Sequence, residues 1–132
     1  MTASGVYPRD FLYHSGHEWV AVTGDVCTVG ITEFAQSELE EIVFVELPEV
    51  GARLGAGDVI GSVESIKAVA ELYTPIGGEV LEVNEELKSW PAFLNEDPHG
   101  KGWMIKLRPS RQEDLDRLMS ADAYERHIRP ES

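Results

Sequence analysis

Short runs of alternating apolar and polar residues dominate the chain and predict β-strands rather than helices. Residues 17–31 contain two such runs around Thr23-Gly24-Asp25, a turn cluster typical of a β-hairpin. Further strands are expected in five segments separated by glycine and proline turns: residues 42–48, 58–65, 68–75, 78–84 and 103–109. Strands this short and this frequent predict a β sandwich or barrel.

Two segments depart from this pattern and predict helices. Residues 32–41 begin at Thr32, whose hydroxyl can cap a short helix, and acidic side chains in the first turn suit the helix dipole. Residues 110–128 begin with Ser110 and Glu113 at capping-box spacing and carry an apolar stripe. The fold is therefore expected to be mainly β, with short antiparallel strands, a short internal helix and a C-terminal helix.

Length and composition fit a single domain. The chain has 132 residues, of which 42% are hydrophobic, enough for one core. We expect that core to span about residues 13–108 of a domain covering 1–132, followed by the helix over about 110–128. The acidic segment 84–102 is expected to be a long loop with at most one helical turn.

A strong negative charge limits the partners. The formal net charge is −13, so the chain repels phosphate backbones and anionic lipid headgroups, and neither nucleic acid nor a membrane is an expected partner. Basic patches on other proteins suit it better. The N-terminal residues lack the hydrophobic segment of a secretory signal, and no apolar run reaches the ~20 residues of a membrane span. These features favour an intracellular protein, although a removed transit peptide stays possible.

Neither catalysis nor metal binding has a clear signature in the sequence. Cys27 is the only cysteine, which excludes an internal disulfide, and its place in a strand favours a small buried core residue. The histidines (His14, His17, His99 and His127) show no nucleophile–base spacing. His14 and His17 could share a metal ion only on a helix, whereas their region has the pattern of a strand entrance. No metal site is therefore expected.

One lysine stands apart from its surroundings. Between Asp10 and Leu87 the only lysine or arginine residues are Arg53 and Lys67. If the strands that flank Lys67 pair with each other, this residue lies at a hairpin tip and its amine points into water. Such a lysine is easy for a modifying enzyme to reach, but exposed lysines are common and position alone does not establish a role.

Seven segments of the chain form a distinctive series: HEWV, TVGITEFAQSEL, IVFVELPEVG, VESIKA, GGEVLEVNEEL, NEDPHGKGWMIKL and ADAYE. VESIKA, which contains Lys67, resembles the lipoylation motif of lipoyl carrier domains. The whole series, in this order and at these separations, resembles the glycine cleavage system H protein family, H-like lipoate-binding proteins included. The series extends from about residue 13 to residue 124. The resemblance implies a lipoyl-domain-like barrel-sandwich hybrid with lipoate joined to Lys67 by an amide.

The resemblance also implies what the chain does. It would be no enzyme but a carrier, shuttling the aminomethyl group of glycine between glycine decarboxylase, aminomethyltransferase and dihydrolipoyl dehydrogenase. A lipoate ligase or lipoyltransferase would attach the cofactor. Because a shuttle must dock with several enzymes in turn, a monomer is expected. The expected location is the cytoplasm of a bacterium or archaeon, or a mitochondrion if a transit peptide has been removed.

Five further residues match functional positions of the family. Glu18, Glu71 and Thr74 match positions in the cleft that holds the loaded arm, where carboxylates would bind its cationic amine. Glu64 and Gly78 match positions that help the lipoylating enzyme choose its target. Ordinary readings stay open: a solvated carboxylate, a turn hydroxyl, or, for Gly78, the geometry of a tight turn.

Several departures from the family pattern keep a second function open. Leu39-Glu40-Glu41 stands where the family commonly has Leu-Gly-Asp, Ala68-Val69-Ala70 replaces a small polar triplet, and Gly16 replaces a polar residue. The change at residues 68–70 is expected to alter the rim of the cleft, and the loss of glycine at position 40 to alter the helix exit or an acidic partner surface. The alternative is an H-like lipoate-binding protein that carries sulfur beside a heterodisulfide-reductase-like complex in sulfur oxidation. A biotinyl carrier is disfavoured because its lysine is usually flanked by methionines, and an unmodified interaction module would show no added mass at Lys67.

Overall fold

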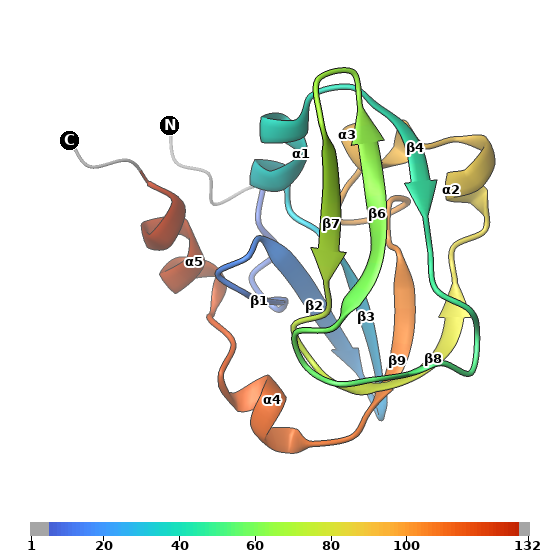
Figure 1. Ribbon diagram of the computed structural model, residues 1–132. Helices are drawn as coiled ribbons and strands as arrows, with labels where there is room; N and C mark the ends of the chain where they lie inside the picture. The colour runs from blue at the N-terminus through green and yellow to red at the C-terminus, as the bar shows by residue number, and fades with distance from the viewer. Residues whose placement is uncertain (1–5, 130–132) are drawn as a thin grey trace.

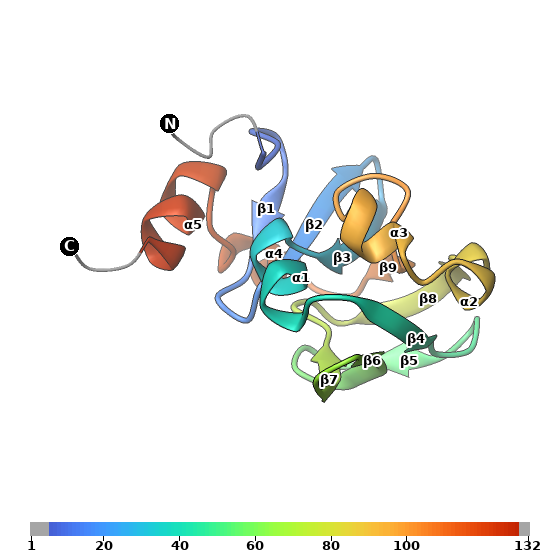
Figure 2. The ribbon, with the colours of Figure 1, turned by 90° about the horizontal axis from the view of Figure 1, so that it is seen from above.

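The computed structural model describes residues 6–129, which fold into two antiparallel sheets with short helices around them (Figures 1 and 2). The first five residues, part of the segment used above to argue against a secretory signal, lie outside this range. The strands are β1 (Leu12–Tyr13), β2 (Glu18–Thr23), β3 (Val26–Ile31), β4 (Ile42–Glu46), β5 (Arg53–Leu54), β6 (Val59–Ser65), β7 (Val69–Tyr73), β8 (Gly78–Val83) and β9 (Ile105–Pro109). The helices are α1 (Glu33–Leu39), α2 (Glu86–Ser89), α3 (Phe93–Glu96), α4 (Gln112–Asp116) and α5 (Ala121–Ile128).

The two sheets face each other across one hydrophobic core. One sheet has the strand order β1-β2-β3-β9-β8-β5, and the other has the order β4-β6-β7. Figure 2 shows the three-stranded sheet lying across the larger one. Both sheets contribute fully buried side chains to the core, among them Val29, Val63 and Leu107. The expected mainly β architecture of short antiparallel strands is therefore confirmed, with two separate sheets and no closed barrel among the described residues.

The expected hairpin and internal helix are both confirmed. β2 and β3 pair antiparallel from Glu18–Ile31 to Thr23–Val26, so Gly24 and Asp25 form the turn. Helix α1 begins after Thr32, whose Oγ1 accepts a hydrogen bond from the backbone N–H of Ala35 at 3.2 Å. Cys27 is fully buried in the core, as its strand position predicted.

The expected single helix over residues 110–128 is divided into α4 and α5. Tertiary pairing explains the break, because Met119 forms a β-bridge with Tyr13, donating to its carbonyl at 2.7 Å and accepting from its N–H at 2.8 Å. An extended residue cannot continue a helix, so the apolar stripe is interrupted there. Ser120 then caps α5 by accepting from the N–H of Ala123, whereas Ser110 caps neither helix.

The expected acidic loop over residues 84–102 is also more ordered than its composition indicates. It contains two short helices, α2 and α3, which Pro91 separates. Each helix contributes one fully buried side chain to the core: Leu87 from α2 and Leu94 from α3. Burial of these two leucines stabilises helices that are too short to form alone. Within residues 6–129, no helix has the length and apolar character that a membrane crossing requires.

A second, aromatic cluster packs α5 against Tyr7, β1 and β2. Its buried members are Tyr7, Tyr13, Trp19, Ala121 and Tyr124. Tyr13 and Tyr124 stack at a centroid distance of 4.9 Å, and the Trp19 indole N–H donates to the carbonyl of Pro98 at 2.9 Å. This cluster holds the β1–β2 turn in place, which becomes one wall of the cleft described below.

Candidate functional site

Lys67 lies in the tight turn between β6 and β7, at one end of the three-stranded sheet (Figure 1). Strand pairing continues up to Glu64–Val69, and the N–H of Ser65 donates to the carbonyl of Ala68 at 2.8 Å. The Lys67 side chain is 53% exposed. The hairpin-tip position predicted from the flanking strands is therefore correct.

The buried hydroxyl of Ser65 organises this turn. Its Oγ accepts hydrogen bonds from the backbone N–H groups of Lys67 at 3.2 Å and Ala68 at 3.1 Å, and donates to the carbonyl of Ala68. The remaining N–H, that of Ile66, donates to the carbonyl of Glu41 at 3.0 Å. Every backbone N–H of the turn is thus satisfied, which gives the lysine a rigid base.

The amine of Lys67 has one acidic neighbour. Nζ lies 3.6 Å from Oε2 of Glu40, in the segment that follows α1. Both side chains are about half exposed, so this ion pair contributes little to stability, about 0–1 kcal/mol. In this structure the lysine side chain extends toward the segment that follows α1.

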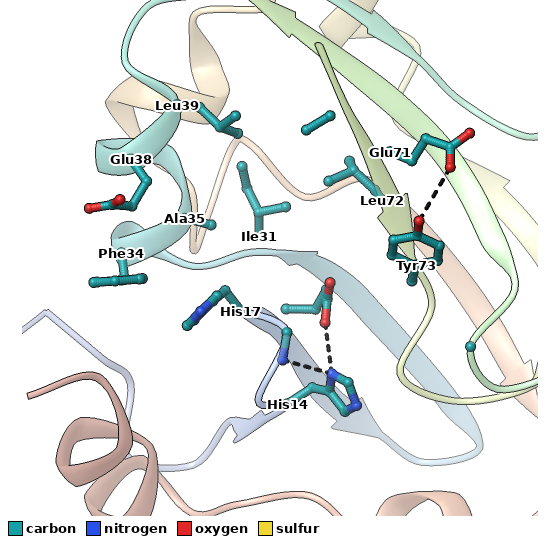
Figure 3. A pocket seen from close by; sticks show the side chains of 14 residues that line it. His14, His17, Ile31, Phe34, Ala35, Glu38, Leu39, Glu71, Leu72 and Tyr73 are labelled. Carbon is teal, nitrogen blue, oxygen red and sulfur yellow. Dashed lines mark hydrogen bonds and ion pairs between the residues drawn. The ribbon is translucent and has the colours of Figure 1, made fainter. Parts of the chain in front are cut away.

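A cleft with a volume of about 560 Å³ lies between α1, the β1–β2 turn and β7 (Figure 3). Leu39 and Ala70 lie at its end near the Lys67 turn, and Ile31 and Leu72 contribute further apolar lining. The remaining lining residues include the three carboxylates Glu18, Glu38 and Glu71 and the histidines His14 and His17. The cleft can therefore accommodate an apolar chain with a polar or cationic end.

Glu18 is the most buried of these carboxylates. It is 5% exposed at the start of β2, and its Oε1 lies 3.0 Å from Nδ1 of His14. Hydrogen bonding to Glu18 raises the pKa of His14, although partial burial opposes the shift. The local sequence pattern does not predict this pair, because the two side chains meet only through the conformation of the β1–β2 turn.

His17 and Tyr124 connect the cleft wall to the aromatic cluster. Nδ1 of His17 lies 2.9 Å from the Tyr124 hydroxyl, which lies 2.7 Å from the hydroxyl of Thr32. The His17 ring also packs on Phe34 at a centroid distance of 4.7 Å. Burial lowers the pKa of His17 and raises that of Tyr124, so both groups stay neutral near pH 7. His17 thus packs structurally and also lines the cleft.

The remaining cleft residues expected from the sequence separate into two groups. Glu71 lines the cleft from the exposed edge of β7, where its Oε1 accepts from the Tyr73 hydroxyl at 3.2 Å. Thr74 is not among the lining residues. It is buried, and its hydroxyl donates to the carbonyl of Ile76 at 2.6 Å, which shapes the turn after β7.

Glu64 and Gly78 lie in different places. Glu64 is exposed at the end of β6 near the Lys67 turn, between Phe44 and Val69 on the neighbouring strands. Gly78 begins β8, at the far end of β7 from that turn (Figure 1). A Cβ there would meet the carbonyl oxygen of Arg108 at 2.3 Å, so close packing of two backbones requires glycine.

Two antiparallel sheets, with a lysine at the tip of a tight hairpin and a cleft beside it, define the class of lipoyl-type carrier domains. The family model described as glycine cleavage H-protein matches residues 11–131. The chain therefore belongs to the glycine cleavage H-protein family.

Individual relatives agree with this assignment. The glycine cleavage system H protein of Staphylococcus epidermidis is 54% identical over 121 residues, which cover 92% of this chain and 96% of that protein. That of Bacillus subtilis is 55% identical over 118 residues, covering 89% and 93%. The crystal structure of a glycine cleavage system H protein from Mycobacterium marinum superposes with a TM-score of 0.81 at 39% identity, covering 89% of this chain and 94% of that one.

Family membership fixes the class of function. The chain is a lipoyl carrier of the H-protein type, a component of the glycine cleavage system rather than one of its catalysts. The relatives named above are bacterial. None of them is named for sulfur oxidation, so the alternative derived from the altered residues near the cleft finds no support.

Proposed function

We propose that Lys67 carries lipoate in amide linkage and that the cleft beside it shelters the end of the lipoyl arm. The observation that carries this proposal is the structure of the turn. The amine of Lys67 is exposed, and every backbone N–H of the turn that bears it is hydrogen-bonded. A modifying enzyme needs access to the amine, and a swinging arm needs a fixed anchor. Lys67 meets both requirements.

The residues of the cleft fit such an arm. Leu39, Ala70 and Leu72 offer apolar contacts to a hydrocarbon chain, and Glu18 and Glu71 offer negative charge to its far end. When attached, the lipoyl group would supply a strained disulfide whose opening would leave one sulfur as a thiol and the other free to carry the aminomethyl group. We assign to Glu18 and Glu71 the role of binding the cationic amine of that group by charge-assisted hydrogen bonds. The buried position of Glu18 strengthens its contribution, because little water competes there.

Recognition by the lipoylating enzyme is assigned to Glu64 directly and to Gly78 indirectly. Glu64 lies near the modified turn, and the exposed side chains of Phe44 and Val69 flank it across the sheet. A lipoate ligase or lipoyltransferase must close over this end of the sheet to reach Nζ. Gly78 acts through the close approach of β8 to β9, where a Cβ would meet the carbonyl oxygen of Arg108.

The partners of the loaded arm are the other components of the glycine cleavage system. We propose that the arm meets glycine decarboxylase, aminomethyltransferase and dihydrolipoyl dehydrogenase in succession. The net charge of −13 favours partner surfaces that are basic around the entry to their active sites. Docking rates should therefore fall as ionic strength rises.

Glycine-dependent release of carbon dioxide by glycine decarboxylase tests the proposal. The lipoylated protein should support release, and the same preparation with Lys67→Arg should not, since arginine keeps the positive charge but cannot be acylated. The bare, unlipoylated chain should also be inactive. Release supported by either control would contradict the proposed function.

A further inference from the structure

Glu40, which follows α1, has a backbone conformation that glycine occupies far more readily than other residues. Its φ is 66° and its ψ is −147°, a region that side chains with a Cβ strongly disfavour. The residue is exposed, so burial of its side chain does not compensate for this strain. Strained residues of this kind persist where the surroundings impose them, and they cluster at functional sites.

Two sets of hydrogen bonds impose the conformation of Glu40. On one side, Asn95 of α3 donates to the carbonyl of Glu40 at 2.7 Å and to the side chain of Gln36 at 2.9 Å. On the other side, the carbonyl of Glu41 accepts from the N–H of Ile66 in the lysine turn. The backbone of the strained corner is therefore fixed relative to the Lys67 turn, which places the Glu40 side chain beside the lysine.

The carboxylate contacts Lys67 in the unmodified protein, where Nζ lies 3.6 Å away. Acylation of Lys67 would remove the positive charge but leave one N–H on the same nitrogen. An amide N–H donates well to a carboxylate, and hydrogen bonds to charged acceptors are the stronger ones. Glu40 is thus placed to contact the same atom before and after modification.

The direction of this contact leads toward the cleft. Leu39, the residue before Glu40, and Ala70, three residues after Lys67, both line the end of the cleft near the turn. If the Lys67 side chain is oriented toward Glu40, a group attached to Nζ lies over Leu39 and Ala70. A lysine free of Glu40 could equally extend into water.

We propose that Glu40 is a positioning residue for the lipoyl arm: its carboxylate accepts a hydrogen bond from the amide N–H at Nζ of lipoylated Lys67 and directs the arm into the cleft. This inference rests on the proposed lipoylation of Lys67. On this inference, the strained conformation of Glu40 serves to protect the lipoyl arm and does not stabilise the fold.

The rate at which a water-soluble reductant opens the dithiolane measures shelter of the arm without any partner enzyme. Lipoylated wild type, Glu40→Gly, Glu40→Gln and the charge-matched control Glu41→Gln are brought to full modification, verified by intact mass. Reduction is followed by loss of the near-ultraviolet dithiolane absorption. We expect Glu40→Gly to be reduced about three- to tenfold faster than wild type, Glu40→Gln to be intermediate, and Glu41→Gln to match wild type.

Stability separates this role from a merely structural one. Because glycine relieves the strain at position 40, Glu40→Gly should unfold at a urea concentration equal to or higher than wild type while its arm is less protected. Equal reduction rates in wild type and Glu40→Gly, or a lower unfolding midpoint with unchanged protection, would overturn the inference. A wild type that accepts no lipoyl group at Lys67 would overturn the proposed function and this inference together, whereas equal rates on lipoylated proteins would overturn the inference alone.

Discussion

Nδ1 of His14 lies 3.0 Å from Oε1 of Glu18, so a titratable imidazole contacts the most buried carboxylate of the cleft. The same nitrogen lies 3.0 Å from the backbone N of Gly16. A ring nitrogen has a single in-plane position for a proton or a lone pair, so it serves these two partners in different states. When Nδ1 carries a proton it donates to Glu18, and when it does not it accepts from Gly16.

Stability should depend on the charge of His14 with a definite sign. Hydrogen bonding to Glu18 raises the pKa of His14 in the folded state. The contribution of the His14–Glu18 pair to the free energy of unfolding is therefore fully present below the unfolded-state pKa of His14 and is lost as pH rises through its folded-state pKa. Because the side chain is 43% exposed, the effect should stay below about 1 kcal/mol. Urea unfolding of wild type and His14→Gln should differ more at about pH 5.5 than at about pH 8. A difference that grows with pH would show that the pair is not formed.

Loss of charge at Glu18 should shorten the life of the loaded arm. Glu18→Gln keeps the shape of the side chain but removes the charge that binds the amine, a loss of about 1.5–3 kcal/mol in a buried hydrogen bond. Spontaneous ammonia release from loaded protein should then be about ten- to hundredfold faster than in wild type. Glu71→Gln, exposed at the strand edge, should have a smaller effect. Equal release rates in all three proteins would remove both glutamates from the proposed role.

The Ser65 hydroxyl should matter for both stability and modification. Ser65→Ala leaves the N–H groups of Lys67 and Ala68 without their acceptor, which should cost about 1–3 kcal/mol and loosen the turn. Lipoylation of Lys67 should slow as well. Ser62→Ala is the matched control, because it removes a hydroxyl from the same strand whose recorded hydrogen bond, to Glu46, is solvent-exposed, and it should change stability by less than about 0.5 kcal/mol. Similar losses in the two variants would contradict the role of Ser65.

His99 should make the protein acid-sensitive. Burial lowers its pKa to about 4, and its Nε2 accepts from the N–H of Glu33 at 3.3 Å, so the folded state favours the neutral ring. A depressed histidine pKa contributes stability above the unfolded-state value, which is lost as pH falls from about 6.5 toward about 4. The stability difference between wild type and His99→Gln should shrink by about 2–3 kcal/mol over that interval. A constant difference would mean that His99 titrates normally.

The local part of the site was predictable from the sequence. Two β-type runs around residues 66–67 placed the lysine at a hairpin tip, and Thr32 before an acidic first turn marked the start of α1. These features depend on residues close in the chain, whose preferences act before the fold forms. The cleft carboxylates Glu18 and Glu71 came from the family resemblance instead.

The parts that depend on distant contacts were not predictable in this way. The bridge between Met119 and Tyr13 divides the C-terminal helix, and no local pattern marks a residue for pairing with one so far away. The strained corner at Glu40 depends on Asn95, and the turn role of Thr74 depends on the close packing around it. In each case a tertiary interaction outweighs the local preference.

Peptide mass spectrometry of protein produced with lipoate and a lipoylating enzyme tests the central claim most directly. The account predicts that the peptide containing Lys67 gains the mass of one lipoyl group. The intact mass of the Lys67→Arg variant should not increase. A lipoyl group on any other lysine, or an unmodified chain that still supports glycine-dependent carbon dioxide release, would contradict it.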